Sequence, residues 1–229
     1  MMKDMGRENG VALIIVLMAI VLLTALGVTL TLATSLETTI AGNFRENQEA
    51  FYAADAIVER AVDEIATTGD WNALLDGSVR SSFIDGPPSG VRTLSDGSIV
   101  DLALVANMAN CRKTTICSAN EMDLITAERP WAANNPRWQL YAYGNLRDLL
   151  PSGVIDSSYY VVAMVADDAS ENDNDPLRDS ADPGNPGAGV LVLRVDAFGP
   201  RGARKTVEAT VARSPTAGVR IRSWHHVRG

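Results

Sequence analysis

Oxygen-bearing side chains are crowded into one stretch of the chain, residues 167–187 (DDASENDNDPLRDSADPGNPG). Carboxylate and amide oxygens are the ligands that Ca²⁺ prefers, with about six to eight of them around the ion. The spacing is not that of an EF-hand, because no aspartate is followed by both Gly at the sixth position and Glu at the twelfth. The sequence predicts a calcium site here, with a solvated acidic loop as the alternative, and the expected ligands are Asp167, Asp168, Asp173, Asp175 and Asp179.

The two cysteines of the chain, Cys111 and Cys117, are separated by six positions (CRKTTIC). A structural zinc site needs four ligands, and His225 and His226 are the only histidines in the sequence. A catalytic thiol would need a nearby base, which this sequence hardly offers. In an oxidising compartment the spacing instead predicts a small loop closed by a structural disulfide.

The sequence contains few residues that could form a catalytic site. Both histidines lie near the C-terminus, so a Ser-His-Asp or Cys-His arrangement would require that end of the chain to fold back into a pocket. A phosphate-binding GxxxxGK[ST] loop is absent from the sequence, and the net charge of −8 is unlike that of nucleic-acid-binding domains. We therefore expect neither an enzyme nor a nucleic-acid-binding protein, and no cofactor beyond a calcium ion.

The acidic loop, the cysteines and the histidines all come after an apolar stretch, residues 11–36. This stretch contains no charged side chain. As a helix rising ~1.5 Å per residue it would be about 39 Å long, enough to cross a hydrocarbon layer of about 30 Å. A cleaved secretory signal fits poorly, because its apolar region normally spans about 7–15 residues. The stretch is therefore predicted to be a membrane anchor.

The residues around this stretch resemble a known family. A short charged leader closed by Gly10, an apolar start (VALII) and a continuing helix resemble a type IV prepilin or pseudopilin. The segments SLE (35–37), AGNFR (41–45) and AFYAAD (50–55) resemble, more specifically, the N-terminal region of the PilX group of minor pilins. The resemblance covers residues 6–60, and it implies cleavage after Gly10 by a prepilin peptidase, N-methylation of Val11 and assembly into a pilus.

One position departs from the usual pilin pattern. Most pilins carry Glu at the fifth position of the mature chain, and here that position is Ile15. The PilX group and the K-type minor pseudopilins of type II secretion share this absence and are thought to sit at filament tips. The residues that the resemblance places in the membrane and then in the filament core include Val11, Ile15, Leu22, Gly27 and Leu36.

After the anchor, the helix is expected to continue through residues 37–68 as an amphipathic half. Phe44, Phe51, Val58 and Ile65 recur every seven residues, with Ile40, Ala54 and Ala61 beside them, which predicts one apolar stripe. Gly27 and Gly42 each weaken a helix by about 1 kcal/mol relative to Ala, so they are the expected points of bending. The alternative is close packing of another helix against these small residues.

Residues 69–229 are predicted to form one globular head. Four segments have strand composition, residues 137–143, 159–166, 190–197 and 205–212, with 198–202 as a hairpin loop. A short helix is expected at 70–75 with Trp71 in the core, a further strand at 98–106, and a disordered tail at 219–229. A long N-terminal helix packed on an antiparallel β-sheet is an α+β fold, and it is also the pilin architecture.

The predicted organisation is a prepilin leader (1–10), a transmembrane and filament-core half-helix (11–36), an amphipathic half-helix (37–68) and a head (69–229) with the acidic loop 167–187. The resemblance implies a minor pilin that starts or caps a type IV pilus, held by one inner-membrane span with a periplasmic head and later found at the extracellular tip. Its expected partners are other minor and major pilins, the inner membrane, the prepilin peptidase and a tip adhesin. The alternatives are a K-type minor pseudopilin and a permanently anchored periplasmic binding module whose leader is never removed.

Overall fold

The structure is a computed structural model that describes residues 6–124, 132–150, 153–214, 216 and 218–227. The first half of the predicted leader, residues 1–5, therefore lies outside the described residues, as do residues 228 and 229 of the predicted tail. The chain divides into two units, residues 1–45 and residues 46–229.

The long helix α1 runs from Gly6 to Thr67 without interruption. The sequence has no proline before Pro87, so every residue of this stretch can keep its helical backbone hydrogen bond. The predicted long N-terminal helix is thus confirmed, and it ends at Thr67, one residue before the expected bound of 68. Gly27 and Gly42 both lie inside the continuous helix.

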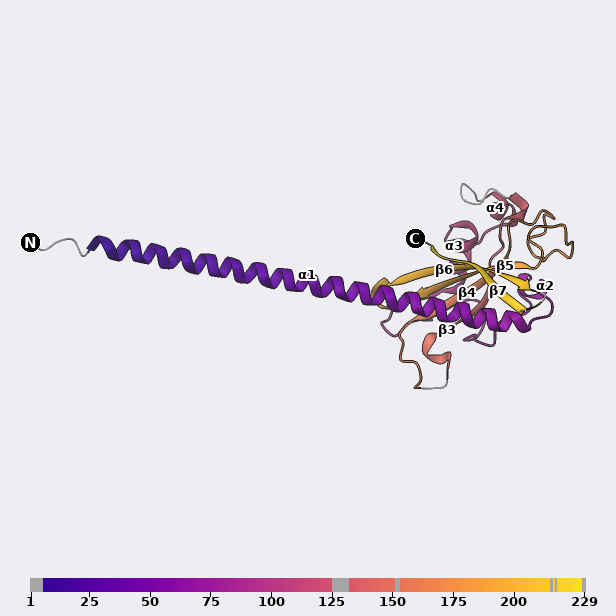
Figure 1. Cartoon of the computed structure of the whole chain (residues 1–229), viewed down its shortest axis with the longest axis horizontal. Coiled ribbons are helices and arrows are strands. Elements are labelled where there is room, and N and C mark those ends of the chain that lie inside the picture. Colours follow the sequence, from indigo (N-terminus) through magenta and orange to yellow (C-terminus); the bar gives the residue numbers. More distant parts are fainter. Residues whose placement is uncertain (1–5, 125–131, 151–152, 215, 217, 228–229) are drawn as a thin grey trace, which may run out of the picture. The chain divides into compact units, whose positions relative to one another are not determined.

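Within the second unit, the last turns of α1 lie along a five-stranded antiparallel sheet (Figure 1). The strands follow one another in chain order as a meander: β3 (Gln139–Asn145), β4 (Tyr160–Asp167), β5 (Val190–Phe198), β6 (Arg204–Ser214) and β7 (Gly218–Val227). The four predicted strands are present, with bounds shifted by a few residues at most, and residues 198–202 do join β5 to β6. The α+β prediction is confirmed.

The predicted disordered tail is wrong, because residues 218–227 form β7 at the edge of the sheet. This strand pairs with β6 along its length, from Ser214 opposite Gly218 to Thr206 opposite Val227. Most of its residues are exposed, and apolar and polar residues alternate only over the four residues 219–222 (VRIR), which is a short signal for a strand. Charged side chains on an edge strand also discourage pairing with another chain.

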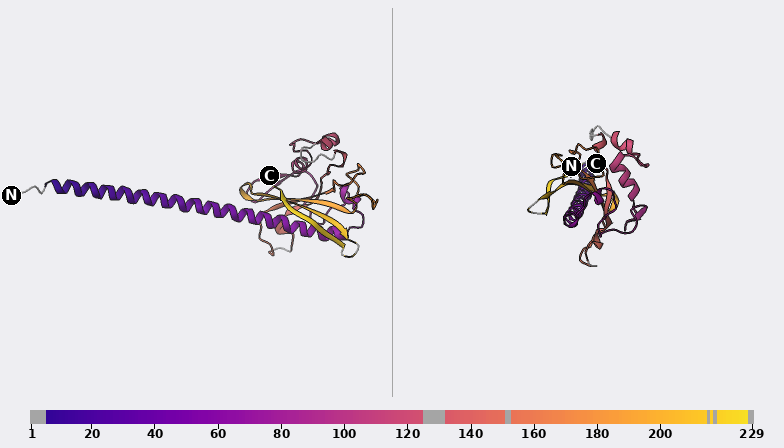
Figure 2. Two further views of the ribbon diagram at one scale, coloured as in Figure 1. Left: turned by 45° about the horizontal axis from the view of Figure 1, so that its top comes forward. Right: turned by 90° about the vertical axis from the view of Figure 1, so that its right-hand side faces the viewer.

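The sheet is covered on both faces (Figure 2). One face packs on α1, and its core includes Val161, Ala163 and Val165 of β4. The other face carries α3 (Leu102–Cys111) and the small hairpin of β1 (Val91–Thr93) and β2 (Ile99–Asp101). As a result β4 is buried at every residue, which explains its continuous apolar sequence.

The apolar stripe of α1 is only partly as predicted. Val58 and Ile65 are buried with Ala54 and Ala61, but Phe44 remains 65% exposed and Ile40 is also exposed. The buried face of the helix begins at Ala50 and consists mainly of small residues; its members are Ala50, Ala53, Ala54, Ile57, Val58, Ala61 and Ile65. Small side chains let the helix backbone approach the sheet closely, whereas bulky residues such as phenylalanine at these positions would hold it further away.

The predicted strand at 98–106 is also wrong, because only β2 is extended and α3 begins at Leu102. Asp101 ends the strand as a helix N-cap, and its side chain accepts hydrogen bonds from the backbone N–H groups of Ala103 and Leu104. Before this region, α2 (Asn72–Leu75) confirms the predicted short helix, and Trp71 is buried as expected. A further short helix, α4 (Ala119–Leu124), precedes β3.

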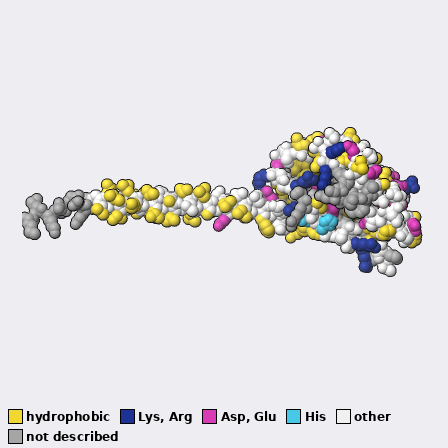
Figure 3. Space-filling model, turned by 90° about the horizontal axis from the view of Figure 1, so that it is seen from above, with side chains coloured by type: hydrophobic (Ala, Val, Ile, Leu, Met, Phe, Trp, Pro, Cys, Tyr) yellow, Lys and Arg dark blue, Asp and Glu magenta, His cyan; other side chains and the backbone are white. Residues whose placement is uncertain are grey.

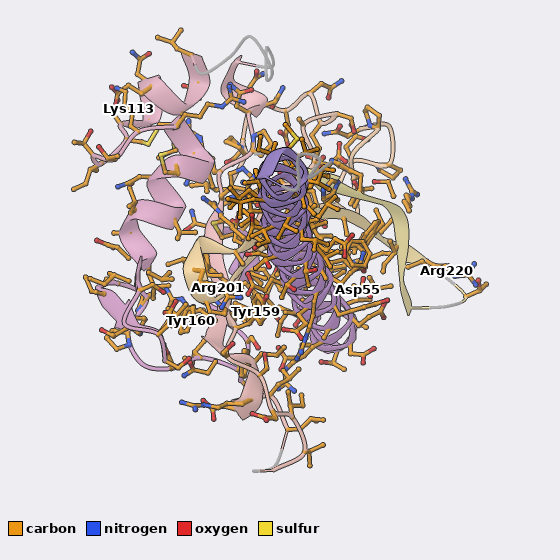
Figure 4. All side chains as sticks on the ribbon, turned by 90° about the vertical axis from the view of Figure 1, so that its left-hand side faces the viewer. Asp55, Lys113, Tyr159, Tyr160, Arg201 and Arg220 are labelled. Atoms are coloured by element: carbon orange, nitrogen blue, oxygen red, sulfur yellow. A yellow bond between two sulfur atoms is a disulfide. The ribbon has the colours of Figure 1, made fainter. Side chains whose placement is uncertain are left out.

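Tyr159 and Tyr160 direct their rings to opposite faces of the sheet, since successive residues of an extended chain alternate (Figure 4). The hydroxyl of Tyr159 donates a 2.7 Å hydrogen bond to the backbone carbonyl of Glu46 in α1. Arg201, in the loop between β5 and β6, forms an ion pair with the Glu46 side chain. These contacts tie the first helical turn of the second unit to the end of the sheet.

Cys111 and Cys117 form the predicted disulfide, with their Cα atoms 6.0 Å apart. The bond joins the last residue of α3 to the segment before α4, near Lys113 in Figure 4. Both cysteines are buried.

Removing this disulfide is expected to lower the free energy of unfolding of the head by about 2 kcal/mol, because a short closed loop restricts the unfolded chain. The measurement is urea unfolding of the full chain in detergent, comparing the Cys111→Ala/Cys117→Ala variant with the oxidised protein. A reducing agent should shift the unfolding midpoint of the natural protein and leave that of the double variant unchanged. Equal midpoints for the oxidised protein and the variant would contradict the expectation.

Candidate functional site

Residues 11–36 of α1 present apolar side chains on all sides. Val11, Ile15, Leu22 and Leu36 are each more than half exposed. Hydrophobic side chains cover the helix along this stretch in Figure 3. The helix is long and apolar enough to cross a membrane, with a mean hydropathy of 3.1 in its most apolar window and none of that window buried. An apolar surface of this kind requires a lipid or protein environment.

The threonines in this stretch do not oppose such an environment. The hydroxyls of Thr29, Thr31 and Thr34 each donate a hydrogen bond of 2.8–2.9 Å to the backbone carbonyl four residues earlier. Thr24 does the same with Ile20 and Val21. Each hydroxyl donor is therefore satisfied within the helix, as an apolar medium demands.

The positions expected to matter for processing and packing lie on this helix. Gly10 and Val11 fall in its early turns, and residues 6–10 of the predicted leader are helical. A Cβ atom added at Gly10 or at Gly27 would meet nothing within 4 Å. Neither glycine is therefore required by contacts within the described part of the chain.

A second candidate site lies at the end of β4 and in the loop that leads to β5. The carboxylates of Asp167, Glu171 and Asp179 approach one another, with one ligand oxygen from each within 4.8 Å of the others. Asp167 is the last residue of β4, whereas Glu171 and Asp179 come from the loop. The site is thus formed where the sheet ends and the loop folds back over it.

Hydrogen bonds hold two of these carboxylates in place. Glu171 accepts from the backbone N–H of Ser180 and, at 3.2 Å, from the side-chain amide of Asn185. Asp179 Oδ1 accepts a 2.6 Å hydrogen bond from the N–H of Gly189, one residue before β5. The backbone N–H of Asp179 donates to Asn72 Oδ1 of α2, which lies at the same end of the head (Figure 1).

The electrostatics of the cluster favour a positive ligand or a proton. Burial raises the pKa of Asp167 to about 9, and the neighbouring Glu171 carboxylate adds to the rise. Burial likewise raises the pKa of Glu171 to about 7, against the stabilising N–H of Ser180. The pKa of Asp179 is also raised, chiefly by burial. Three carboxylates held this close cannot all be ionised without a counter-charge.

The structure brings together only part of the predicted ligand set. Asp167 and Asp179 belong to the cluster, whereas Asp173 lies near enough to Glu171 to add to the rise in the Glu171 pKa that burial mainly causes. Asp168 instead accepts a hydrogen bond from the N–H of Ser170 in its own turn. Asp175 accepts from the N–H of Leu177 and pairs with Arg178 at 3.6 Å.

Glu171 was not among the predicted ligands. In the sequence it stands between Ser170 and Asn172, and no spacing rule separates it from its acidic neighbours. Its burial depends on Gly187, where a Cβ atom would collide with the Glu171 side chain and lie 2.9 Å from its backbone nitrogen. Gly187 lies sixteen residues after Glu171 in the sequence. Its contact with Glu171 can be recognised only in the folded loop, so it could not have identified Glu171 as a ligand beforehand.

The N-terminal region is the part of the chain that comparison with known proteins identifies. The family model described as PilX N-terminal matches residues 9–59. Those residues are similar to the N-terminal region of PilX-type pilins. No curated protein and no solved structure matches the chain.

This PilX N-terminal segment (residues 9–59) contains the whole apolar stretch and the beginning of the buried face of α1. The sheet, the disulfide and the acidic cluster lie beyond it. The predicted PilX resemblance is confirmed for these residues.

The histidines lie on β7 rather than in an enclosed catalytic site. His225 Nε2 is 3.5 Å from Glu208 of β6, and Glu208 is also bound at 2.8 Å by Arg194 Nη1. These residues line an open groove of about 1080 Å³ on the face of the sheet, beside Trp138 and Met108. Ser170 also lines this groove, and in the described part of the chain no hydrogen bond joins it to His225.

Proposed function

We propose that this protein is a minor pilin, a structural subunit that acts in the initiation of a type IV pilus or at its tip. The observation that carries the proposal is the PilX N-terminal match on a continuous helix in which residues 11–36 carry no charged side chain. The α+β head, with α1 packed on an antiparallel sheet, agrees with the pilin architecture.

In this proposal the same apolar surface serves two environments. Before assembly, residues 11–36 hold the protein in the inner membrane with the head in the periplasm. After removal of residues 1–10 by a prepilin peptidase, the helix leaves the lipid and packs among the helices of other minor and major pilins. Both environments are apolar, so the transfer exposes little of this surface to water.

Ile15 supports a minor role over that of a bulk subunit. It is an exposed apolar residue at the fifth position after Gly10, where a carboxylate would pair with the N-terminal amine of a neighbouring subunit. A subunit without this carboxylate lacks one attraction that would dock it beneath an earlier subunit. Such a subunit is suited to the first position of the filament, at its tip. The K-type minor pseudopilin of type II secretion shares this feature and is the second candidate.

Processing after Gly10 is the critical test. Replacement of this residue by Val is expected to leave the leader uncut, so that intact mass spectrometry finds the unprocessed chain in the membrane fraction and none in sheared filaments. The natural protein should begin at Val11, carry one added methyl group at its amine, and co-purify with the filaments.

Gly27→Val is the matched control, because it makes the same substitution in the same helix at a position where a Cβ also meets nothing within 4 Å. Its leader should be removed normally. An intact leader in the natural protein, with none of the chain in filaments, would leave a permanently anchored periplasmic module instead. Processed protein found only with secretion components would favour the pseudopilin.

A further inference from the structure

The acidic cluster contains one carboxylate oxygen that the protein leaves unsatisfied. Asp167 is only 3% exposed, and its Oδ1 atom has no hydrogen-bond partner among the described residues. Buried carboxylate oxygens nearly always have a hydrogen-bond donor or a cation beside them. Asp167 belongs to the cluster in which ligand oxygens of Glu171 and Asp179 lie within 4.8 Å. The unsatisfied atom is therefore found where other anionic oxygens already converge.

The donors and their spacing define the kind of ion. The cluster offers carboxylate oxygens and no nitrogen or sulfur, so it suits a hard cation rather than zinc or copper. Two oxygens on opposite sides of Ca²⁺ are about 4.6–5.2 Å apart, against about 4.0–4.2 Å around Mg²⁺. Oxygens within 4.8 Å of one another can surround Ca²⁺ without movement of the chain.

Hydrogen bonds from surrounding residues fix the positions of two carboxylates of the cluster. The N–H groups of Ser180 and Gly189 and the amide of Asn185 bind Glu171 and Asp179, which fixes both carboxylates. Asp173 adds a fourth carboxylate next to Glu171, and Arg213 of β6 offsets part of the negative charge at Asp179.

We infer that Asp167, Glu171 and Asp179 bind one Ca²⁺ ion, which joins the end of β4 to the loop that returns to β5. The ion supplies the missing partner of Asp167 Oδ1. It also links three points of a loop that is otherwise held to the head by contacts such as the hydrogen bond between Asp179 and Asn72. The conformation of this loop therefore depends on calcium, independently of the assignment as a pilin.

The test is calcium binding by the full chain in detergent after treatment with EGTA. Isothermal titration with CaCl₂ should give one site with a Kd on the order of 10 µM, at the weak end of the range for calcium-sensor sites. At that affinity, 1 mM Ca²⁺ should raise the Tm of the head by about 5–10 °C. The same concentration of Mg²⁺ should give a clearly smaller rise, and an equal rise would overturn the assignment to calcium.

Asp167→Asn is the decisive variant, because it keeps the shape of the side chain and removes its charge. It should weaken Ca²⁺ binding at least about tenfold. In the absence of calcium its Tm should equal or exceed that of the natural protein, since a neutral amide of the same shape replaces a buried acid with an unsatisfied oxygen. A residue with only a structural role would lower the Tm both with and without calcium.

Asp175→Asn is the matched control, an aspartate of the same loop whose carboxylate binds the N–H of Leu177 and lies outside the cluster. It should keep the natural response to calcium. Glu171→Gln repeats the test should Asp167→Asn fail to fold, as judged by circular dichroism. The inference is overturned if the natural protein shows neither heat nor a Tm shift with CaCl₂, or if both cluster variants keep the natural affinity.

Discussion

Replacing Asp196 by Ala should lower the free energy of unfolding of the head by about 3–5 kcal/mol, the usual effect of removing one partner from a buried ion pair. Asp196 is 0% exposed on β5. Its Oδ1 accepts hydrogen bonds from Arg204 Nη2 at 2.9 Å and from Thr206 Oγ1 at 2.5 Å, and its Oδ2 accepts from Arg194 Nε at 3.3 Å. The Ala variant would leave these donors without their shared acceptor.

The measurement is urea unfolding of the full chain in detergent, followed by tryptophan fluorescence. All four tryptophans lie after residue 70, so the signal reports on the head alone. Asp156→Ala is the matched control, because Asp156 is exposed and outside the helices and strands; its effect should stay within about 0.5 kcal/mol. Similar effects for the two variants would show that the Asp196 network contributes little.

Trp71→Ala is expected to cost about 3–5 kcal/mol, because it removes the largest side chain of the core between α1 and the sheet and leaves a cavity. Trp71 is 1% exposed, and its ring nitrogen donates to the carbonyl of Ile65 at 3.4 Å. The guanidinium of Arg213 lies 4.2 Å from the ring centre and would lose a cation–π contact.

Trp224→Ala is the comparison, since it makes the same substitution on the edge strand β7. Trp224 is 37% exposed and meets the ring of Phe51 edge to face at 5.3 Å, so its removal should cost about 1 kcal/mol. The fluorescence of the remaining tryptophans, among them the buried Trp138, follows unfolding in both variants. If Trp224→Ala costs as much as Trp71→Ala, burial is not what sets the size of these effects.

Features that depend on local composition could be predicted from the sequence. The apolar residues 11–36 and the absence of proline before Pro87 were enough to predict the long helix. Alternating side chains marked β5 and β6, and the spacing of Cys111 and Cys117 indicated their disulfide. In each case the energetic preference lies in residues that are near one another in the chain.

The errors arose where distant residues decide the conformation. Residues 98–106 contain β-branched and apolar residues, yet capping by Asp101 and packing of Leu102 and Val105 against β4 make most of them helical. The mostly exposed segment at 218–227 is a strand because it pairs with the edge of the sheet at β6. Local propensity is weak beside such contacts.

The composition of the loop at 167–187 was sufficient to predict an acidic, oxygen-rich segment and, by inference, a cation site. It was not sufficient to choose the carboxylates that meet. Asp167 is placed by the sheet, Asp179 by Asn72 and Gly189, and Glu171 by the close approach of Gly187. The sequence by itself determined the apolar stretch, the long helix and the acidic composition of the loop. Only the tertiary structure decided which carboxylates are buried together. The reason is that their burial and their approach depend on residues far apart in the chain.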